Sequence, residues 1–422
     1  MTGLDALIKE IDRDLAPVDA RLAVTYPGDR GARQPVHTVY VPADRYHRGV
    51  ATEWGAAAVT ALAEHAGSVG ELGEVWGVAP VLAEAVRDRV LHKLAVEPIE
   101  DLRIDFEDGY GRRPDAEEDA DAVRAADELA ASVAAGGAPP FTGIRFSGLE
   151  AATRRRGLRT LHAFLGALVL AGGVPPGFVV TLPKVTAVEQ VSALVRVTER
   201  LEQEYGLAAG ALRFEIQVET PQSVLAADGT VPLARMIHAA ASRCAGLHYG
   251  TYDYSAALGI SARYQSMEHP VADHAKQVMQ VAAAGTGVWL SDGSTNVLPI
   301  GDRAAVVAAW RLHGRLVRRS LERGFYQGWD LHPGQLPSRF ITCYAFYRES
   351  FEAAATRLRE YVERVDSGFL DEPATAAALS GFLLRGIDCG ALDDSEVTDR
   401  ISADLPHLAL LARRPPQQPE TR

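Results

Sequence analysis

Short apolar or alternating runs recur along the chain, and each is separated from the next by a stretch with helical periodicity. The eight runs are VHTVYVPA (36–43), DLRIDFED (101–108), TGIRFSG (142–148), FVVTLPKV (178–185), RFEIQVET (213–220), GLHYGTYD (246–253), GVWLSDGS (287–294) and GWDLHPGQ (328–335). Strands that alternate with helices indicate a parallel sheet, because parallel neighbours need a crossover connection. Eight such units are the number that closes a barrel. The pattern therefore predicts an α/β fold of the (β/α)8 (TIM barrel) class.

The connection between the first two runs is too long for a single helix. We predict two helices there, around 49–66 and 79–95, with the glycine-punctuated stretch 67–77 as the turn between them. The barrel therefore has an expanded first connection. Between the fourth and fifth runs, one helical face is marked by apolar positions at helical spacing: Val188, Val191, Leu194, Val195 and Leu201.

Beyond residue 336 the pattern is helical only. Apolar and aromatic residues recur there at spacings of three, four and seven: Phe340, Tyr344, Tyr347, Phe351, Leu358, Tyr361 and Val365. We interpret this stripe as packing against the barrel or against a neighbouring subunit, which makes a homo-oligomer the expected state. The expected organisation is a helical segment (1–35), the barrel (36–340), a helical extension (341–411) and a disordered tail (412–422).

Composition and charge restrict the class of protein. The 422 residues are 47% hydrophobic and 23% charged, which is typical of a globular protein with a substantial core. A formal net charge of −12 argues against nucleic acid as a partner, since its backbone attracts basic surfaces. The acidic amphipathic start MTGLDALIKEIDRDL is unlike a signal peptide, and no apolar run reaches the roughly 20 residues that a membrane span needs. Three widely spaced cysteines without CxxC pairing fit reduced thiols, so we expect a cytoplasmic protein without a membrane partner.

The C-terminal ends of the predicted strands, where barrels of this type carry their catalytic residues, are unusually polar. They hold Asp105, Glu107, Asp108, Arg145, Lys184, Glu219, Asp253, Asp292 and His332. On the fifth run, charged or polar residues alternate with Phe214, Ile216 and Val218, and the second run alternates in the same way. Because the outer face of each strand must pack on helices, we predict that the charged set points into the barrel.

Glu219 and Asp253 end adjacent predicted strands, and no His or Cys stands at an obvious ligand spacing. Buried carboxylates need partners, because an isolated buried charge is very costly. A hard, oxygen-ligated ion such as Mg²⁺ or Mn²⁺ would satisfy them, and so would a network of arginines and carboxylates. Spacing alone leaves both interpretations open.

Seven of these segments, in order, resemble one known family. VYVPADR is similar to its opening strand, DFEDGYG to its acidic signature, IRFSG to its arginine strand and TLPKV to its LPKV strand; EIQVETPQSVL, YGTYDYSAALG and GWDLHPGQ resemble the three segments that follow. The family is the HpcH/HpaI aldolase and citrate lyase β-subunit superfamily, within the phosphoenolpyruvate/pyruvate-type barrels. The resemblance extends from about residue 36 to residue 340.

The resemblance implies metal ligation by Glu219 and Asp253, with Arg145 contacting a substrate oxygen. A 2-oxo acid would chelate Mg²⁺ or Mn²⁺, which acts as a Lewis acid while Arg145 offsets the developing negative charge. Asp108 stands where the family's pyruvate aldolases carry histidine and its citrate-lyase-like members carry aspartate. Glu107 and Asp108 are candidates for holding metal-bound water or for proton transfer, and a structural role is the alternative for both.

Other features bear on the substrate. Related lyases that use coenzyme A thioesters hold them partly by basic residues near the acidic signature. In GRRPDAEEDADAV, Arg112 and Arg113 are followed by a dense acidic run, which weakens the case for such a substrate. The expanded connection 45–100 is a candidate lid, so Arg45 and His47, just after the first strand, are candidate substrate contacts. We interpret Lys184 and His332 as structural.

In the C-terminal region, Asp388 is a candidate for an acidic residue that related lyases place over a neighbouring subunit's site.

Together these features predict a Mg²⁺-dependent carbon–carbon lyase or aldolase. Its substrate would be a small hydroxy or oxo carboxylic acid or its CoA thioester, cleaved through a metal-stabilised enolate. One alternative is a phosphoenolpyruvate-utilising or thioester-hydrolysing enzyme on the same barrel. Another is a non-catalytic barrel subunit of a larger complex. No GxxxxGK[ST] motif occurs, which argues against a P-loop kinase.

Overall fold

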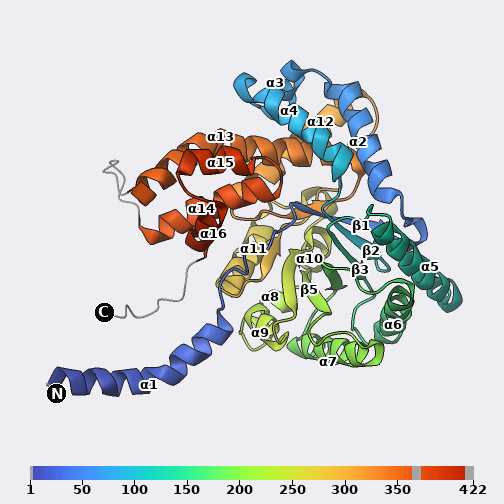
Figure 1. Cartoon of the computed structure of the whole chain (residues 1–422). Coiled ribbons are helices and arrows are strands. Elements are labelled where there is room, and N and C mark those ends of the chain that lie inside the picture. Colours follow the sequence, from blue (N-terminus) through green and yellow to red (C-terminus); the bar gives the residue numbers. More distant parts are fainter. Residues whose placement is uncertain (1–2, 364–371, 414–422) are drawn as a thin grey trace.

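Eight parallel strands form a nearly closed ring in the computed structural model, which describes residues 3–363 and 372–413 (Figure 1). The strands are β1 (His37–Pro42), β2 (Asp101–Asp105), β3 (Phe141–Arg145), β4 (Phe178–Leu182), β5 (Arg213–Val218), β6 (Cys244–Tyr249), β7 (Trp289–Ser291) and β8 (Gly328–Asp330). Their order is β7-β6-β5-β4-β3-β2-β1-β8, and a bridge between Ser291 and Gln327 links the two ends. The predicted TIM barrel is confirmed.

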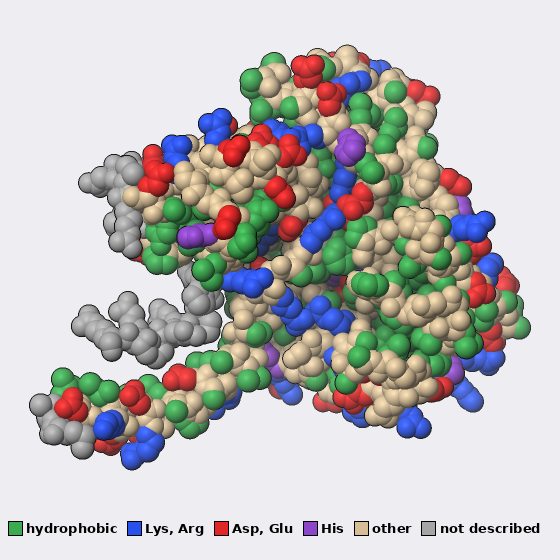
Figure 2. All heavy atoms as spheres, viewed as in Figure 1, with side chains coloured by type: hydrophobic (Ala, Val, Ile, Leu, Met, Phe, Trp, Pro, Cys, Tyr) green, Lys and Arg blue, Asp and Glu red, His purple; other side chains and the backbone are tan. Residues whose placement is uncertain are grey.

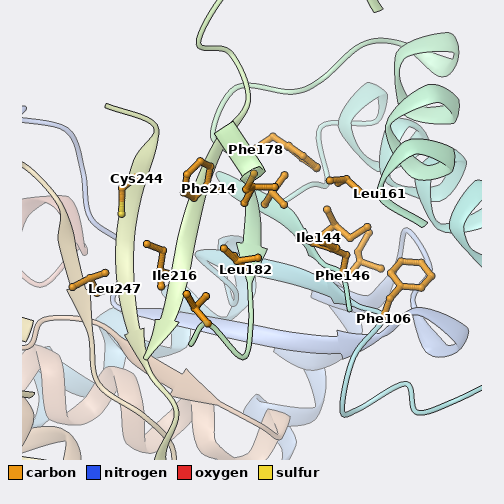
Figure 3. Close-up of a cluster of buried hydrophobic side chains, with 14 of the residues drawn as sticks. Phe106, Ile144, Phe146, Leu161, Phe178, Leu182, Phe214, Ile216, Cys244 and Leu247 are labelled. Carbon is orange, nitrogen blue, oxygen red and sulfur yellow. The ribbon is translucent and has the colours of Figure 1, made fainter. Parts of the chain in front are cut away.

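Helices follow the strands as the pattern predicts. Those around the barrel are α5 (Asp115–Ala134), α6 (Arg154–Ala171), α7 (Val188–Tyr205), α8 (Pro221–Val224), α9 (Pro232–Ala239), α10 (Thr251–Ala257), η2 (Ala262–Tyr264), α11 (Pro270–Ala283) and α12 (Arg303–Glu322). The outward apolar positions of the strands pack beneath them. Figure 3 shows Ile144, Leu182 and Ile216 of three strands in one buried cluster with Leu161 of α6.

The inward positions are charged and pair with each other across the barrel. Arg103 of β2 donates from Nη2 to Oε2 of Glu215 on β5 at 2.7 Å, and it also contacts Asp101. All three side chains are buried. The predicted alternation is therefore confirmed, and this lower layer of the interior is a salt-bridge network.

The expanded first connection contains η1 (Ala43–Arg45), α2 (Val50–Ala66), α3 (Val69–Trp76) and α4 (Pro80–Val96). The two predicted helices are present, but the stretch 67–77 is not a simple turn, because it forms α3. Ser68 caps this helix by accepting from the backbone N–H of Glu71, whose carboxylate accepts from Ser68 in return. Gly77, with a φ of 72°, ends it in the left-handed conformation.

The C-terminal extension consists of η3 (Pro333–Gln335), α13 (Leu336–Glu363), α14 (Pro373–Asp388), α15 (Asp394–Ile401) and α16 (Leu405–Ala412). Its aromatic stripe packs inside the chain. Phe340, Tyr344 and Tyr347 join Trp310 of α12 and residues of α2–α4 in a second core. Phe351 and Leu358 form a third core with α14–α16. Figure 1 shows both groups of helices on one flank of the barrel.

This packing bears on two expectations. From Phe340 to Tyr361 the stripe packs against the chain's own helices, which is the first of the two interpretations, and a homo-oligomer stays a prediction. The helices of the expanded connection are held against α12 and α13, which is unlike a free lid. The predicted domain boundary at 340 falls within α13. Val365 and residues 414–422 of the predicted disordered tail lie outside the described residues.

Helix α1 (Gly3–Thr25) projects away from the rest of the molecule (Figure 1). It contains no buried residue, and Figure 2 shows hydrophobic side chains exposed along it between acidic and basic ones. A helix thus forms much of the predicted N-terminal segment. Within the described ranges, no helix is both long and apolar enough to span a membrane.

Candidate active site

Six charged side chains meet at the C-terminal end of the barrel. Arg145 is the last residue of β3, and Glu219 follows β5 directly. Asp253 lies in α10, just after β6. The other three are Glu107 and Asp108 after β2 and Lys184 after β4. The fold thus gathers the two predicted metal ligands and the three predicted catalytic residues around a lysine that we had interpreted as structural.

The ammonium group of Lys184 lies among four carboxylates. Its Nζ is 2.9 Å from Oδ2 of Asp108 and 2.9 Å from Oδ1 of Asp253. It is 3.6 Å from Oε1 of Glu107 and 3.8 Å from Oε2 of Glu219. One ammonium group therefore contacts all four carboxylates, while Arg145 lies 3.5 Å from Glu107 and is bonded to a different carboxylate, that of Asp105.

Backbone geometry holds the group together. Lys184 has a φ of 52°, and its backbone N–H donates to Oε1 of Glu219 at 2.7 Å. A left-handed conformation is uncommon for a residue with a Cβ, so the surrounding contacts must enforce it. Gly250 supplies space on the other side of Glu219, since a Cβ there would lie 2.5 Å from the Cβ of Glu219.

Burial differs within the cluster and shifts the pKa values. Glu219 is buried, and this burial, together with the nearby Asp253, raises its pKa to about 7 against the opposing pull of Lys184. Burial likewise raises the pKa of Glu107 to about 8, although Arg145 and Lys184 oppose the rise. The side chains of Asp108 and Asp253 are 57% and 47% exposed, so solvent reaches the cluster from their side.

Arg145 is oriented by two neighbours. Its Nε and Nη2 donate to the two carboxylate oxygens of Asp105 at 2.6 and 2.7 Å. Its guanidinium carbon lies 4.6 Å from the centre of the Tyr40 ring, in cation–π contact. The remaining nitrogen, Nη1, is 3.5 Å from Oε2 of Glu107 and is available to an incoming oxygen. Asp105 and Tyr40 were not predicted as site residues, although strand alternation had placed Asp105 inside the barrel.

The other predicted residues lie apart from the cluster or at its edge. Arg45 is exposed at the end of η1, and His47 contacts Glu53 of α2 at 3.3 Å. Their role in substrate binding stays a prediction. His332 accepts from the backbone N–H of Gly334 at 3.0 Å, which supports its structural interpretation. Asp388 lines a cavity of about 310 Å³ near the N-terminal ends of β7 and β8, away from the acidic cluster.

The donor set suits a hard divalent cation. Glu219 and Asp253 offer carboxylate oxygens, and the ammonium of Lys184 between them shows that a cation is accommodated there. Among residues 3–363 and 372–413, no three Asp, Glu, His or Cys side chains converge closely enough to hold an ion by themselves. Mg²⁺ takes one or two protein carboxylates and fills its other positions with water and substrate, so two ligands are enough.

Solved structures share this fold. A citrate lyase from Burkholderia xenovorans LB400 matches with a TM-score of 0.57 at 16% identity, covering 89% of this chain and 100% of that one. Malate synthase from Haloferax volcanii, in a lead(II) complex, matches with a TM-score of 0.50 at 15% identity, covering 90% and 99%. One of the two is a citrate lyase, the kind of protein that the sequence resembles, and at these identities the likeness shows the shared fold.

Sequence comparisons add one further finding. A family model described as "Domain of unknown function (DUF6986)" matches residues 15–415, which include the whole barrel and most of the C-terminal extension. No curated protein matches the chain.

Proposed function

The chain belongs to the DUF6986 family, and we propose that it is a divalent-metal-dependent carbon–carbon lyase acting on a small hydroxy or oxo carboxylic acid. One observation carries the proposal. Glu219 and Asp253 face a common cation position, and Arg145 lies beside the same acidic cluster with one nitrogen available. A cation beside a positioned guanidinium can bind a carboxylate substrate and offset charge that develops on its oxygens.

We assign the metal position to Glu219 and Asp253, with Mg²⁺ or Mn²⁺ as the ion. A bound ion of this kind polarises a substrate carbonyl as a Lewis acid. The half-exposed carboxylate of Asp253 would be reached by the ion from solvent, and the buried carboxylate of Glu219 would be its inner ligand. The lead(II) in the malate synthase of Haloferax volcanii is likewise a divalent cation on this fold.

We assign the two acids after β2 opposite roles in a retro-aldol cleavage, because their pKa values are shifted in opposite directions. Burial acts to raise the pKa of Asp108, but its hydrogen bond and attraction to Lys184 outweigh burial and lower the pKa, so Asp108 is ionised and can accept the proton of a substrate hydroxyl. A carbonyl then forms as the adjacent carbon–carbon bond breaks, and the bonding electrons pass to an enolate. Burial raises the pKa of Glu107 to about 8 in the metal-free protein, so Glu107 holds a proton near neutral pH and would be the group that protonates the enolate carbon. Nη1 of Arg145 offsets the charge on the enolate oxygen.

The surroundings of Arg113 favour a free acid over a coenzyme A thioester as the substrate. Arg113 is paired with Asp44 and Glu117, each at 2.7 Å, and its guanidinium stacks on Tyr110. Its charge is therefore already neutralised within the protein, so it is poorly suited to binding an added phosphate.

The test is a screen of free hydroxy acids and acyl-CoA esters with Mg²⁺, followed by release of pyruvate or glyoxylate. We expect cleavage of a free acid, and a loss of at least ~100-fold in Glu219→Gln. Glu204→Gln is the matched control, because Glu204 is an exposed carboxylate paired with His162 on the outer surface. Absence of cleavage for every compound, together with a melting temperature that Mg²⁺ leaves unchanged, would overturn the proposal.

A further inference from the structure

We propose that Lys184 is a built-in counter-ion, which occupies the cation position between Glu219 and Asp253 and is displaced when the divalent metal binds. This side chain would then set the affinity of the site for metal. The inference rests on the proposed function, because it concerns the same metal position.

The first argument is that the two cations compete for the same oxygens. Mg²⁺ binds carboxylate oxygens at about 2.1 Å. The Nζ of Lys184 lies 2.9 Å from Oδ1 of Asp253 and 3.8 Å from Oε2 of Glu219, and the other oxygen of Glu219 is already bonded to the Lys184 backbone N–H. An ion bound to both carboxylates would lie in close contact with the ammonium group of Lys184, and two positive charges in contact repel strongly. Lys184 must therefore move.

The second argument is that the displaced ammonium has a place to go. Asp108 lies 2.9 Å and Glu107 lies 3.6 Å from Nζ, and both come from the end of β2 rather than from β5 or α10. A small side-chain rotation can exchange Asp253 for these two acids while Lys184 remains paired. The backbone of Lys184 stays anchored to Glu219 through its N–H, so only the long side chain has to move.

The third argument is charge balance. Even with Glu107 protonated, the carboxyl groups of Asp108, Glu219 and Asp253 share one ammonium, while the charge of Arg145 is neutralised by Asp105. The single positive charge of Lys184 therefore reduces the repulsion among the acids but does not balance their negative charge. A monovalent cation gains little by replacing an ammonium of equal charge, whereas a divalent cation adds the charge that is missing. Lys184 thus favours divalent over monovalent ions at this position.

A crystal structure of the full-length protein with Mn²⁺ tests the displacement directly, because the ion can be located by its anomalous signal. We expect the ion between Glu219 and Asp253, with Nζ of Lys184 no longer in contact with Asp253 and paired with Asp108 or Glu107. An ion on both carboxylates with Lys184 still bound to Asp253 would overturn the inference, and so would an ion bound elsewhere.

Calorimetric titration with Mg²⁺ tests the effect on affinity. We expect Lys184→Met to bind Mg²⁺ at least tenfold more tightly than the wild type, and Lys184→Arg, which keeps the charge, to bind like the wild type or more weakly. Arg156→Met is the matched control, since Arg156 also pairs with three acids (Asp115, Glu118 and Asp119), but on the outer helices. Its affinity should equal that of the wild type. Thermal melting with and without Mg²⁺ shows whether each variant is folded.

The outcomes separate the two proposals. If the wild type binds Mg²⁺ and Lys184→Met binds it equally or more weakly, the counter-ion role is wrong and the metal site stands. If only Lys184→Met binds Mg²⁺, Lys184 does occupy the cation position, but the proposed metal-dependent activity is wrong. If neither binds, both proposals fail.

Discussion

Arg145 and Asp105 form a bidentate ion pair at the ends of neighbouring strands, with both oxygens of Asp105 engaged. The same carboxylate accepts from the backbone N–H groups of Glu107 and Gly109, at 3.0 and 2.9 Å. One side chain therefore orients the arginine and also shapes the loop that carries Glu107 and Asp108. Asp105 is a positioning residue for both.

This arrangement gives the first prediction. Asp105→Asn should lower kcat/KM by roughly 10- to 100-fold, as is usual when a residue that orients a functional side chain is lost. It should also destabilise the protein by about 3 kcal/mol, because Arg145 would remain buried without its counter-charge. Steady-state kinetics and urea unfolding measure the two effects. Asp228→Asn, at an exposed turn, is the control. Unchanged kinetics in Asp105→Asn would show that Arg145 is positioned by other contacts.

The second prediction concerns the space beside Glu219. In Gly250→Ala the new Cβ would lie 2.5 Å from Cβ and 2.8 Å from Oε2 of Glu219, so Glu219 must shift. The φ of Gly250 is −96°, which alanine adopts freely, so the effect is steric and not a backbone strain. We expect at least a tenfold loss of Mg²⁺ affinity in calorimetric titration.

Gly70→Ala is the control for this substitution. Gly70 lies in α3, and nothing lies within 4 Å of an added Cβ, so alanine should leave metal affinity unchanged and stabilise the helix by up to about 1 kcal/mol. Equal Mg²⁺ affinity in the two variants would contradict the idea that Gly250 makes room for Glu219.

The third prediction concerns pH. The folded protein raises the pKa of Glu107 from 4.5 to about 8, so its folded state binds this proton more tightly than the unfolded chain does. Stability from this group is therefore present at low pH and is lost as pH rises from about 4.5 to about 8. Glu219, with a pKa of about 7, contributes in the same direction. In the presence of a chelator, the wild type should lose stability between pH 5 and pH 8.

Glu107→Gln removes this proton-binding group, so its free energy of unfolding should fall less than that of the wild type between pH 5 and pH 8. The difference in this fall should be roughly 1–3 kcal/mol at pH 8. Urea unfolding at several pH values measures it. The exposed Glu204→Gln should run parallel to the wild type. A Glu107→Gln profile as steep as that of the wild type would mean that Glu107 ionises normally in the folded protein.

The fourth prediction concerns the second core. Phe340 is fully buried where α13 meets the barrel, and its ring contacts those of His37 and Tyr344. Phe340→Ala should destabilise the protein by about 3–5 kcal/mol through lost burial and the cavity left behind. Tyr264→Ala, at a side chain that is 63% exposed, should change stability by less than about 0.5 kcal/mol. Urea unfolding distinguishes them, and similar values would mean that the second core contributes little.

The sequence predicted side-chain directions best within strands, where alternate residues point to opposite faces. Along β5 an apolar face had to pack on helices, so Glu215 and Glu219 could only point inward, and they do. Asp253 was predicted at the end of its strand, but β6 ends at Tyr249 and Asp253 lies on the short helix α10 that follows. The short helix α3 could have been predicted from the sequence, since Ser68 and Glu71 form the S-x-x-E capping box that starts a helix.

Lys184 could not be predicted in the same way. It follows β4 in a loop, where no period fixes the direction of a side chain, and its left-handed backbone has no signature in the sequence. The charges gave an indirect signal, because the acids after β2, β5 and β6 lie at one end of the barrel and need a shared cation. Asp105 was missed for a related reason, since alternation predicted its direction but not its partner.

The expanded first connection and the C-terminal extension share one core, although more than 200 residues separate them in the chain. Loss of either would leave the apolar face of the other exposed to water. We therefore expect the two segments to be gained or lost together among related genes, so a relative with only one of them should carry compensating polar substitutions. The acidic cluster and its loops lie outside this shared core, so substrate preference can diverge while the two segments are inherited together.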